Sequence, residues 1–314
     1  SNEIEQTISL GDQPEEETSI RRGERVFHDG TISVQSWLSC VTCHPEARAD
    51  GNNWDTPDDG FGNPKNTKAL VGVLETPPSL SHGGKPDGRY GIVSSFYFSL
   101  GVQLEEDILN DAVTYVASIE PEVSPYRNPD GSLTEDALAG KAIFESEETQ
   151  CAACHNGPYF TDLKTYNVGT RRSFDSSGDF DNPSLLELWR SAPYLHDGSA
   201  ATLRDVLTTR NPYDLHGKTS HLTDEQIDQL VAYLLQLGMD TAVEDPGVEP
   251  PAPPTAPANV TVTGATYTSV SLSWEAATAS GQGNGIAEYC IYVDDVHVDC
   301  VPGNETSYTV TGLN

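Results

Sequence analysis

Two stretches of the chain carry apolar side chains at the spacing of an amphipathic helix, one over residues 104–119 and one over residues 224–237. Thr223 and Gln226 form a capping box before the second stretch, and Gly238 follows it as a stop signal. We expect both helices to press their apolar faces against a core. The apolar positions are Leu104, Ile108, Ala112, Val116 and Ile119 in the first helix and Ile227, Leu230, Val231, Leu234 and Leu235 in the second.

A shorter pattern, Gly-x-x-(Val/Ile)-Phe, occurs at residues 23–27 and again at residues 140–144. The repetition predicts a matching pair of helices, one in each half of the chain. Ser132 and Glu135 have the spacing of a capping box for the second of them. Long stretches rich in Gly, Pro and Asn, such as 50–66 and 167–183, then precede the closing helices. Loops of that length are uncommon unless they serve a function.

The pattern changes after Met239, where residues 246–257 hold six of the 21 prolines and predict a stiff spacer. Beyond the spacer, short β-type segments alternate with turns at the spacing of a β-sandwich. They are residues 259–263, 270–274, 289–293, 296–301 and 307–310. The sandwich is incomplete at Asn314, so we expect either a truncated domain or one completed by a strand from another chain.

Four of the six cysteines lie in two C-x-x-C-H motifs, the attachment signature of c-type haem. In that chemistry two thiols form thioethers with the porphyrin vinyl groups, and the adjacent histidine ligates iron. The thiols are those of Cys40, Cys43, Cys151 and Cys154, and the proximal histidines are His44 and His155. A four-cysteine zinc site would not need a histidine after each pair. A redox dithiol would need a βαβ context.

The other two cysteines, Cys290 and Cys300, flank a short hairpin in the β region. A disulfide across neighbouring strands suits their spacing and an exported setting, and two free thiols are the alternative.

The chain carries 48 acidic and 17 basic residues, a net charge of −31. This balance excludes nucleic acid as a natural partner and disfavours an anionic membrane surface. Apolar residues are only 36% of the chain, so we expect something besides side chains to fill part of the core. No apolar run approaches the roughly 20 residues of a membrane span. Residues 1–6 lack signal-peptide character, so an exported form would be mature or a fragment.

The stretch CAACHNGPYF, followed by NPSLLELWRSAPYLHDGSAATLRDVL, resembles the bacterial di-haem cytochrome c peroxidase and MauG superfamily. Residues 39–78, from SCVTCH to LETPP, look like the N-terminal haem domain of a subgroup of these proteins. The resemblance covers about residues 8–238 and implies two haem domains joined by an electron path, often with calcium near their interface. It also implies one relay haem with a His/Met pair and one haem, with a displaceable histidine, that reduces hydrogen peroxide to water.

The C-terminal region, with Trp274 in the strand SVSLSW, resembles a fibronectin type III domain. The predicted fold is therefore mainly α, two cytochrome c-like haem domains with long loops, plus an incomplete fibronectin type III-like β-sandwich. We place the first haem domain at 1–122, the second at 123–241, the linker at 242–258 and the β domain at 259–314.

The distal iron ligands depart from the family pattern. Met239, the single methionine, follows the closing helix, whereas a ligand methionine precedes it. His82 follows a Pro-Pro turn and His216 lies in the loop before the closing helix, so we expect these two as distal ligands. His221 and His28 remain alternatives, while His196 belongs to the family signature and is expected to form hydrogen bonds near the haem edge.

Several other side chains are weaker candidates. By resemblance to MauG, Trp54 is a candidate relay between the haems, and Tyr194 or Tyr213 a candidate ligand. One loop offers hard oxygen ligands for calcium, with a solvated acidic loop as the alternative. Its candidate residues are Asp50, Asn52, Asp55, Asp58 and Asp59.

We expect an exported di-haem cytochrome with two covalently bound haem c groups that transfers electrons through bis-His irons. The alternatives are a hydrogen peroxide-reducing peroxidase and a conductive subunit of an extracellular cytochrome assembly. The expected partner is a redox protein or another copy of the chain, joined through the incomplete β domain. The expected location is extracellular or at the cell surface, alternatively periplasmic.

Overall fold

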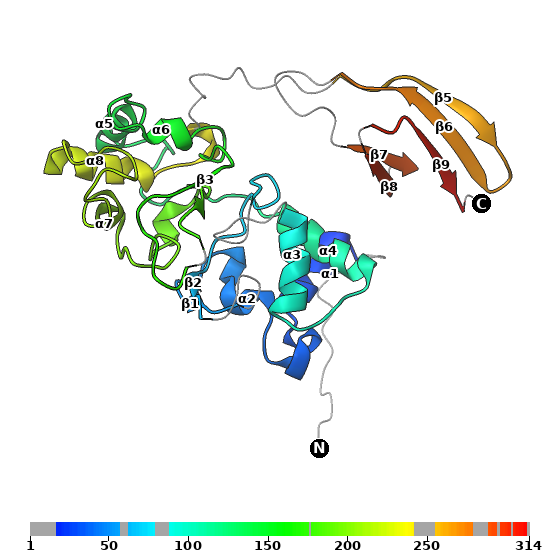
Figure 1. Ribbon diagram of the computed structural model, residues 1–314, viewed down its shortest axis with the longest axis horizontal. Helices are drawn as coiled ribbons and strands as arrows, with labels where there is room; N and C mark the ends of the chain where they lie inside the picture. The colour runs from blue at the N-terminus through cyan, green and yellow to red at the C-terminus, as the bar shows by residue number, and fades with distance from the viewer. Residues whose placement is uncertain are drawn as a thin grey trace. The chain divides into compact units, whose positions relative to one another are not determined.

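The computed structural model describes residues 17–56, 62–78, 88–175, 177–241, 255–278, 288–293, 296–302 and 304–312. The chain forms two compact units, Ser1–Glu244 and Asp245–Asn314 (Figure 1). The first is mainly helical, and the described part of the second contains strands and no helix, which confirms the predicted fold class. The finer domain boundaries stay a prediction. Among the described residues, no helix is both long and apolar enough to cross a bilayer.

The helical unit has two lobes, which we define by their helices. The first lobe contains α1 (Ser19–His28), α2 (Cys40–Cys43), α3 (Gly88–Phe98) and α4 (Glu106–Ala117). The second contains α5 (Glu135–Phe144), α6 (Cys151–Cys154), α7 (Leu203–Leu207) and α8 (Asp224–Leu234). Two-residue strands add β1 (Asn53–Trp54) and β2 (Lys65–Asn66) to the first lobe and β3 (Thr165–Tyr166) and β4 (Phe180–Asp181) to the second.

The predicted repeat is confirmed by the helix pairs α1–α4 and α5–α8. A Cβ atom at Gly23 would lie 1.9 Å from the Asp111 carbonyl oxygen, and one at Gly140 would lie 1.9 Å from that of Gln229. Each glycine therefore allows the entering helix to touch the backbone of the closing helix. Neither position has room for a side chain.

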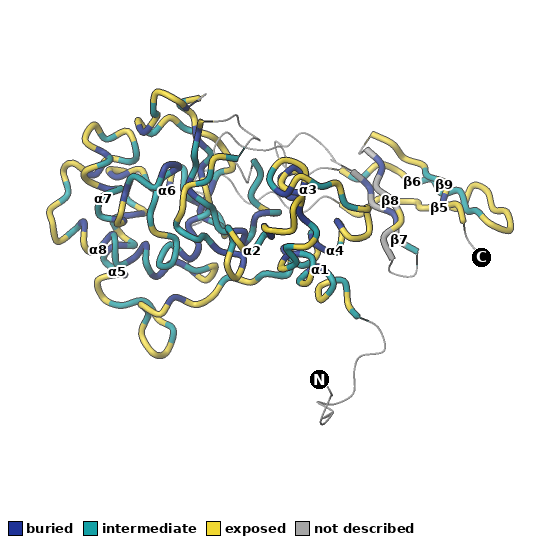
Figure 2. Tube along the Cα trace, turned by 90° about the horizontal axis from the view of Figure 1, so that it is seen from below, coloured by how far each residue is buried: buried dark blue, intermediate teal, exposed yellow. Residues whose placement is uncertain are grey.

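An aromatic pair occupies the same place in each lobe. The rings of Phe27 and Tyr115 lie 5.2 Å apart between centroids, and those of Phe144 and Tyr233 lie 5.3 Å apart. All but Tyr115 are fully or almost fully buried. The hydrophobic core of the second lobe gathers among α5, α6, α7 and α8 (Figure 2).

The long loops are closed by small antiparallel ladders, β1 with β2 and β3 with β4. Each ladder pairs the residues at the start of a loop with those at its end, so the two ends of the loop lie close together. The Gly-rich composition predicted the loops but not the ladders that close them.

Some helix details differ from the sequence-based expectations. The N-cap of α5 is Thr134, whose hydroxyl accepts from the Ala137 N–H, so the predicted capping box at Ser132 is wrong. In α4 the inward side chain is Leu109, and Ile108 is 37% exposed. The capping box of Thr223 and Gln226 is confirmed, although α8 already ends at Leu234.

In the C-terminal unit, β5 (Ala258–Ala265), β6 (Ser269–Glu275) and β9 (Ser307–Thr311) form one sheet. A second sheet pairs β7 (Glu288–Val293) with β8 (Val296–Pro302). Trp274 packs on the small core between the sheets, 5.4 Å from the Tyr289 ring, as predicted. Cys290 and Cys300 are directly opposed in register, while their side chains lie outside the described part, so the disulfide stays a prediction.

A buried ion pair joins the two lobes. The Arg48 guanidinium donates through Nε and Nη2 to the two carboxylate oxygens of Glu187, both at 2.8 Å. Their side chains are 9% and 1% exposed, and Arg48 also donates to the Glu120 carbonyl at 2.9 Å. Burial alone would raise the pKa of Glu187, but hydrogen bonds from Arg48 and the Glu122 backbone N–H hold that pKa below its ordinary value. The pair is therefore ionised in the folded protein.

We expect Glu187→Gln to destabilise the helical unit by about 3–5 kcal/mol, because it leaves the Arg48 cation buried without its counterion. Lys141→Met, which breaks the exposed pair with Glu145, should cost at most about 0.5 kcal/mol. Denaturant unfolding of the holoprotein measures both.

The same pair predicts a pH dependence of the free energy of unfolding. A carboxylate whose pKa is lowered in the folded state stabilises the protein fully at pH values above the ordinary carboxyl range. This stabilisation is lost as the pH falls through the folded-state pKa. Glu187→Gln should flatten this acid dependence, and equal losses in the two variants would contradict the role of the pair.

Candidate haem sites

The two C-x-x-C-H peptides have the same local structure. Each Cys pair spans a single helical turn, α2 in the first lobe and α6 in the second. The following histidines, His44 and His155, cap these turns with similar backbone angles, φ −120° and ψ 67° against φ −99° and ψ 76°. Their N–H groups both donate at 2.9 Å to the carbonyl oxygen of the first cysteine. Each peptide therefore presents two thiols and one imidazole in a fixed arrangement.

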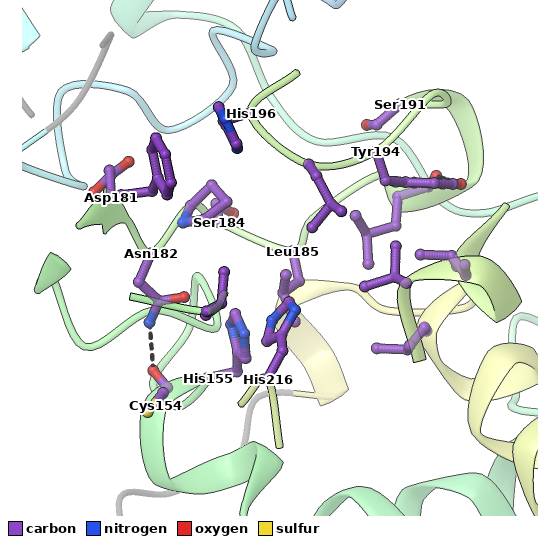
Figure 3. Close-up of a pocket in the computed structure, with 18 of the residues that line it drawn as sticks. Cys154, His155, Asp181, Asn182, Ser184, Leu185, Ser191, Tyr194, His196 and His216 are labelled. Atoms are coloured by element: carbon purple, nitrogen blue, oxygen red, sulfur yellow. Dashed lines mark hydrogen bonds between the residues drawn. The ribbon is translucent and has the colours of Figure 1, made fainter. Parts of the chain in front are cut away.

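A cavity of about 350 Å³ lies mainly in the second lobe. Its walls are mainly apolar and come from α5, α7, α8, the loop over residues 180–196 and residues 66–76 of the first lobe, with Cys151, Cys154 and His155 on one side. His216 lines the same cavity, and its ring lies 6.1 Å from that of His155 between centroids (Figure 3). Two imidazole bonds of about 2 Å to one shared metal would place the ring centroids about 6 Å apart. The cavity and the two rings therefore fit a haem between them.

Both imidazoles are neutral at ordinary pH. Burial and, to a smaller extent, the nearby His155 lower the pKa of His216 to about 4. Burial also lowers the pKa of His155, whose Nδ1 lies 3.0 Å from the Phe160 carbonyl oxygen. Because a carbonyl only accepts, the proton is assigned to Nδ1, which leaves the Nε2 lone pair available for a metal.

The sequence-based reasoning missed Asn211, which holds the His216 loop in place. The Asn211 side chain accepts from the His216 N–H at 2.9 Å and donates to the carbonyls of His216 and Gly217 at 3.0 Å each. Asn211 is only 3% exposed. Its place beside a Pro-Tyr turn was the available signal, because buried asparagines often satisfy loop backbone.

In the first lobe His44 is half-buried, and loss of solvent around its ring lowers its pKa to about 4. The Asp50 carboxylate and, to a smaller extent, the backbone of Lys68 and Arg48 oppose this shift, although no described group completes a hydrogen bond to the His44 Nδ1 atom. Burial raises the pKa of Cys40 to about 12 and, at Cys43, burial and then Asp50 raise it to about 11.

The predicted distal ligand His82 lies outside the described residues, so its role stays a prediction. The alternatives to His216 lie elsewhere. His221 is exposed and 3.9 Å from Glu148, and His28 is exposed at the end of α1. Met239 is 43% exposed in a short turn after α8. Of these candidates, the structure brings only His216 to His155.

His196 is 5% exposed, and its Nε2 atom lies 3.1 Å from an Asp175 oxygen. Its ring stacks on Phe180 at 3.8 Å, and it lines the cavity of the second lobe. The expected hydrogen-bonding role at the cavity edge fits this position. Tyr194 donates its hydroxyl proton to the Leu188 carbonyl at 2.8 Å, and Tyr213 is 81% exposed.

The acidic loop proposed for calcium is organised by its own hydrogen bonds. Asp50 accepts from the backbone and side chain of Asn52, from the Trp54 indole at 2.9 Å and from the Thr67 hydroxyl at 2.7 Å. Asp55 accepts from two backbone N–H groups, and Asp58 and Asp59 lie outside the described residues. Within the described ranges, no three His, Cys, Asp or Glu side chains gather as a metal site. Calcium stays a prediction.

Comparison with known proteins agrees with this geometry. Residues 137–238 match the family model of cytochrome c, and residues 253–314 match that of the fibronectin type III domain. The chain is 33% identical to hydrazine synthase subunit gamma of Kuenenia stuttgartiensis, over 69% of this chain and 77% of the relative. It is 24% identical to a cytochrome-c peroxidase of Pseudomonas sp. (strain SCT), over 73% of this chain and 83% of the relative.

Solved structures show the same relationship. The structure of Kuenenia stuttgartiensis hydrazine synthase matches with a TM-score of 0.67 and 27% identity, over 76% of this chain and all of that chain. A MauG-like protein associated with microbial copper homeostasis matches with a TM-score of 0.56 and 19% identity, over 76% and 95%. The second similarity concerns the fold alone. With its paired C-x-x-C-H lobes, the chain is a di-haem c-type cytochrome that belongs, within the cytochrome c peroxidase and MauG superfamily, to the family of the hydrazine synthase γ subunit.

Proposed function

We propose that this protein transfers electrons and that its second haem is held by His155 and His216. The observation that carries the proposal is the 6.1 Å separation of two half-buried, neutral imidazoles across one cavity. Haem supplies a reversible one-electron couple at such a site. Two protein imidazoles on one iron leave no position for a small substrate, so this arrangement suits electron transfer rather than bond chemistry.

Charge and ligand type both favour a low reduction potential. Two imidazoles stabilise the ferric state relative to a thioether ligand. The net charge of −31 favours the more positive oxidised iron. By analogy with its relative, a subunit of hydrazine synthase, we place the chain as a cytochrome subunit that exchanges electrons with a protein partner. The fibronectin type III module supports a location at the cell surface or outside the cell.

A second candidate is peroxide reduction at the first haem. Relatives named as cytochrome-c peroxidases favour it, including one that matches 73% of this chain. The reaction needs a vacant or releasable position on the iron held by His44, and an acid or amide nearby to assist O–O cleavage.

We expect His216→Ala to convert the second haem from low spin to high spin and to open it to carbon monoxide. His216→Met should keep six-coordination and raise the midpoint potential, because a thioether stabilises ferrous iron. Optical and paramagnetic resonance spectra of the purified holoprotein measure both changes. The matched control is His221→Ala, in the same loop but exposed, which should change nothing. An unaltered spectrum in His216→Ala would remove His216 as a ligand.

Carbon monoxide added at graded stages of reduction separates the two functions. The electron-transfer proposal expects no shift of the second haem at any stage. A shift of the first haem, together with turnover of hydrogen peroxide, would make peroxide reduction the leading function. If the optical bands of both haems stay unchanged at every stage, electron transfer is the function that the result supports.

Covalent attachment can be tested lobe by lobe. We expect the double variant Cys151→Ala/Cys154→Ala to lose the second haem in acidified organic solvent while the first stays bound, because thioether bonds survive that extraction. The matched variant Cys40→Ala/Cys43→Ala should show the reverse. The mass of the denatured chain counts the haems, and two haems retained in either variant would contradict the assignment.

A further inference from the structure

Residues 65–70, which we name the bridging segment, fasten the haem peptide of the first lobe. The Leu70 N–H donates to the Ala47 carbonyl at 2.9 Å, and the Thr67 hydroxyl donates to Asp50 at 2.7 Å. Ala47 and Leu70 both belong to the hydrophobic core of that lobe. The segment is therefore fixed on its first-lobe side close to the Cys40–His44 peptide.

The same segment extends two lysines toward buried carboxylates of the second lobe. The Lys65 ammonium lies 3.0 Å from an Asp175 oxygen, and the Lys68 ammonium forms an ion pair with Asp181. The side chains of Asp175 and Asp181 are 1% and 4% exposed. Each buried carboxylate is thus compensated by a cation from the other lobe.

Lys68 lies between the first haem peptide and the cavity of the second lobe. On either side of it, Thr67 and Leu70 are hydrogen-bonded to Asp50 and Ala47, which follow the first haem peptide. Lys68 and Asp181 line the cavity that holds His155 and His216 (Figure 3 shows Asp181). The Lys68–Asp181 pair is thus held at the wall of the second cavity by a segment fixed to the first lobe.

We propose that Lys68 tunes the second haem: its ammonium, paired with Asp181 at the cavity wall, sets the reduction potential of that haem. This inference rests on the proposed electron-transfer function of the second haem. A cation near a buried iron stabilises the reduced form, and a carboxylate stabilises the oxidised form. Lys68 and Asp181 therefore make opposing contributions to the reduction potential of the second haem, and the two contributions partly cancel.

Opposite substitutions should shift the potential in opposite directions. Lys68→Met leaves the Asp181 carboxylate alone and should lower the midpoint potential of the second haem. Asp181→Asn leaves the ammonium alone and should raise it. The double variant should return close to the wild type. Because burial raises the pKa of Asp181 despite Lys68, the titrations belong at a pH well above the ordinary carboxyl range.

The experiment is a potentiometric titration of the holoprotein that follows each haem by its optical and paramagnetic resonance signals. We expect Lys68→Met to shift the sharing of one electron between the haems about tenfold toward the first, which is about 59 mV. We also expect Lys68→Arg to restore the electron sharing. The control Lys141→Met removes the same charge from an exposed pair on α5 and should shift the sharing less than about twofold.

Equal shifts in Lys68→Met and Lys141→Met would overturn the proposal, as would shifts of the same sign in Lys68→Met and Asp181→Asn. If Lys68→Met does not fold, Asp181→Asn alone still tests the sign. The electron-transfer proposal is judged separately, because its bis-His signal in the wild-type protein does not depend on Lys68.

Discussion

The buried ion pair between Arg48 and Glu187 is the constraint on which the arrangement of the helical unit depends. Arg48 comes only four positions after His44, so the pair fastens the haem peptide of the first lobe directly to the second lobe. An ion pair with this little exposure tolerates neither rotation nor separation, because both would leave a charge buried without a partner. It therefore fixes the register in which the bridging segment meets Asp175 and Asp181.

Within the second lobe, the decisive feature is a cavity that side chains leave open between two imidazoles. The repeated Gly–helix contact brings α5 and α8 close together, and their buried faces form one apolar wall. Asn211 then holds the backbone at His216, and the Phe160 carbonyl holds the His155 ring. The low apolar content of the chain is understandable on this basis, since a porphyrin contributes apolar surface that side chains would otherwise supply.

The features readable from the sequence are the local ones. Cys-x-x-Cys-His motifs, the Thr223 capping box and the alternating strands each depend on neighbours within a few residues, and the structure contains all of them. His216 was also accessible, because loop position relative to α8 is a local property. The contacts of Arg48, Lys68 and Asn211 were not accessible, because nothing in the local sequence says which distant carboxylate or carbonyl each side chain meets. The Ser132 cap failed for a related reason, since Thr134 competes for the same helix start.

The scarcity of cations offers a way to find such contacts. The chain has 17 basic and 48 acidic residues, so a lysine at an arbitrary surface position can pair with an exposed carboxylate nearby. Burying such a lysine would stabilise the protein little. Arg48, Lys65 and Lys68 nevertheless all pass from the first lobe to carboxylates of the second that are at most 4% exposed. Cations placed in this way neutralise the carboxylates buried where the two lobes meet. The attraction within each ion pair offsets part of the desolvation cost of its two charges, so loss of any one cation would leave a buried carboxylate that favours separation of the lobes.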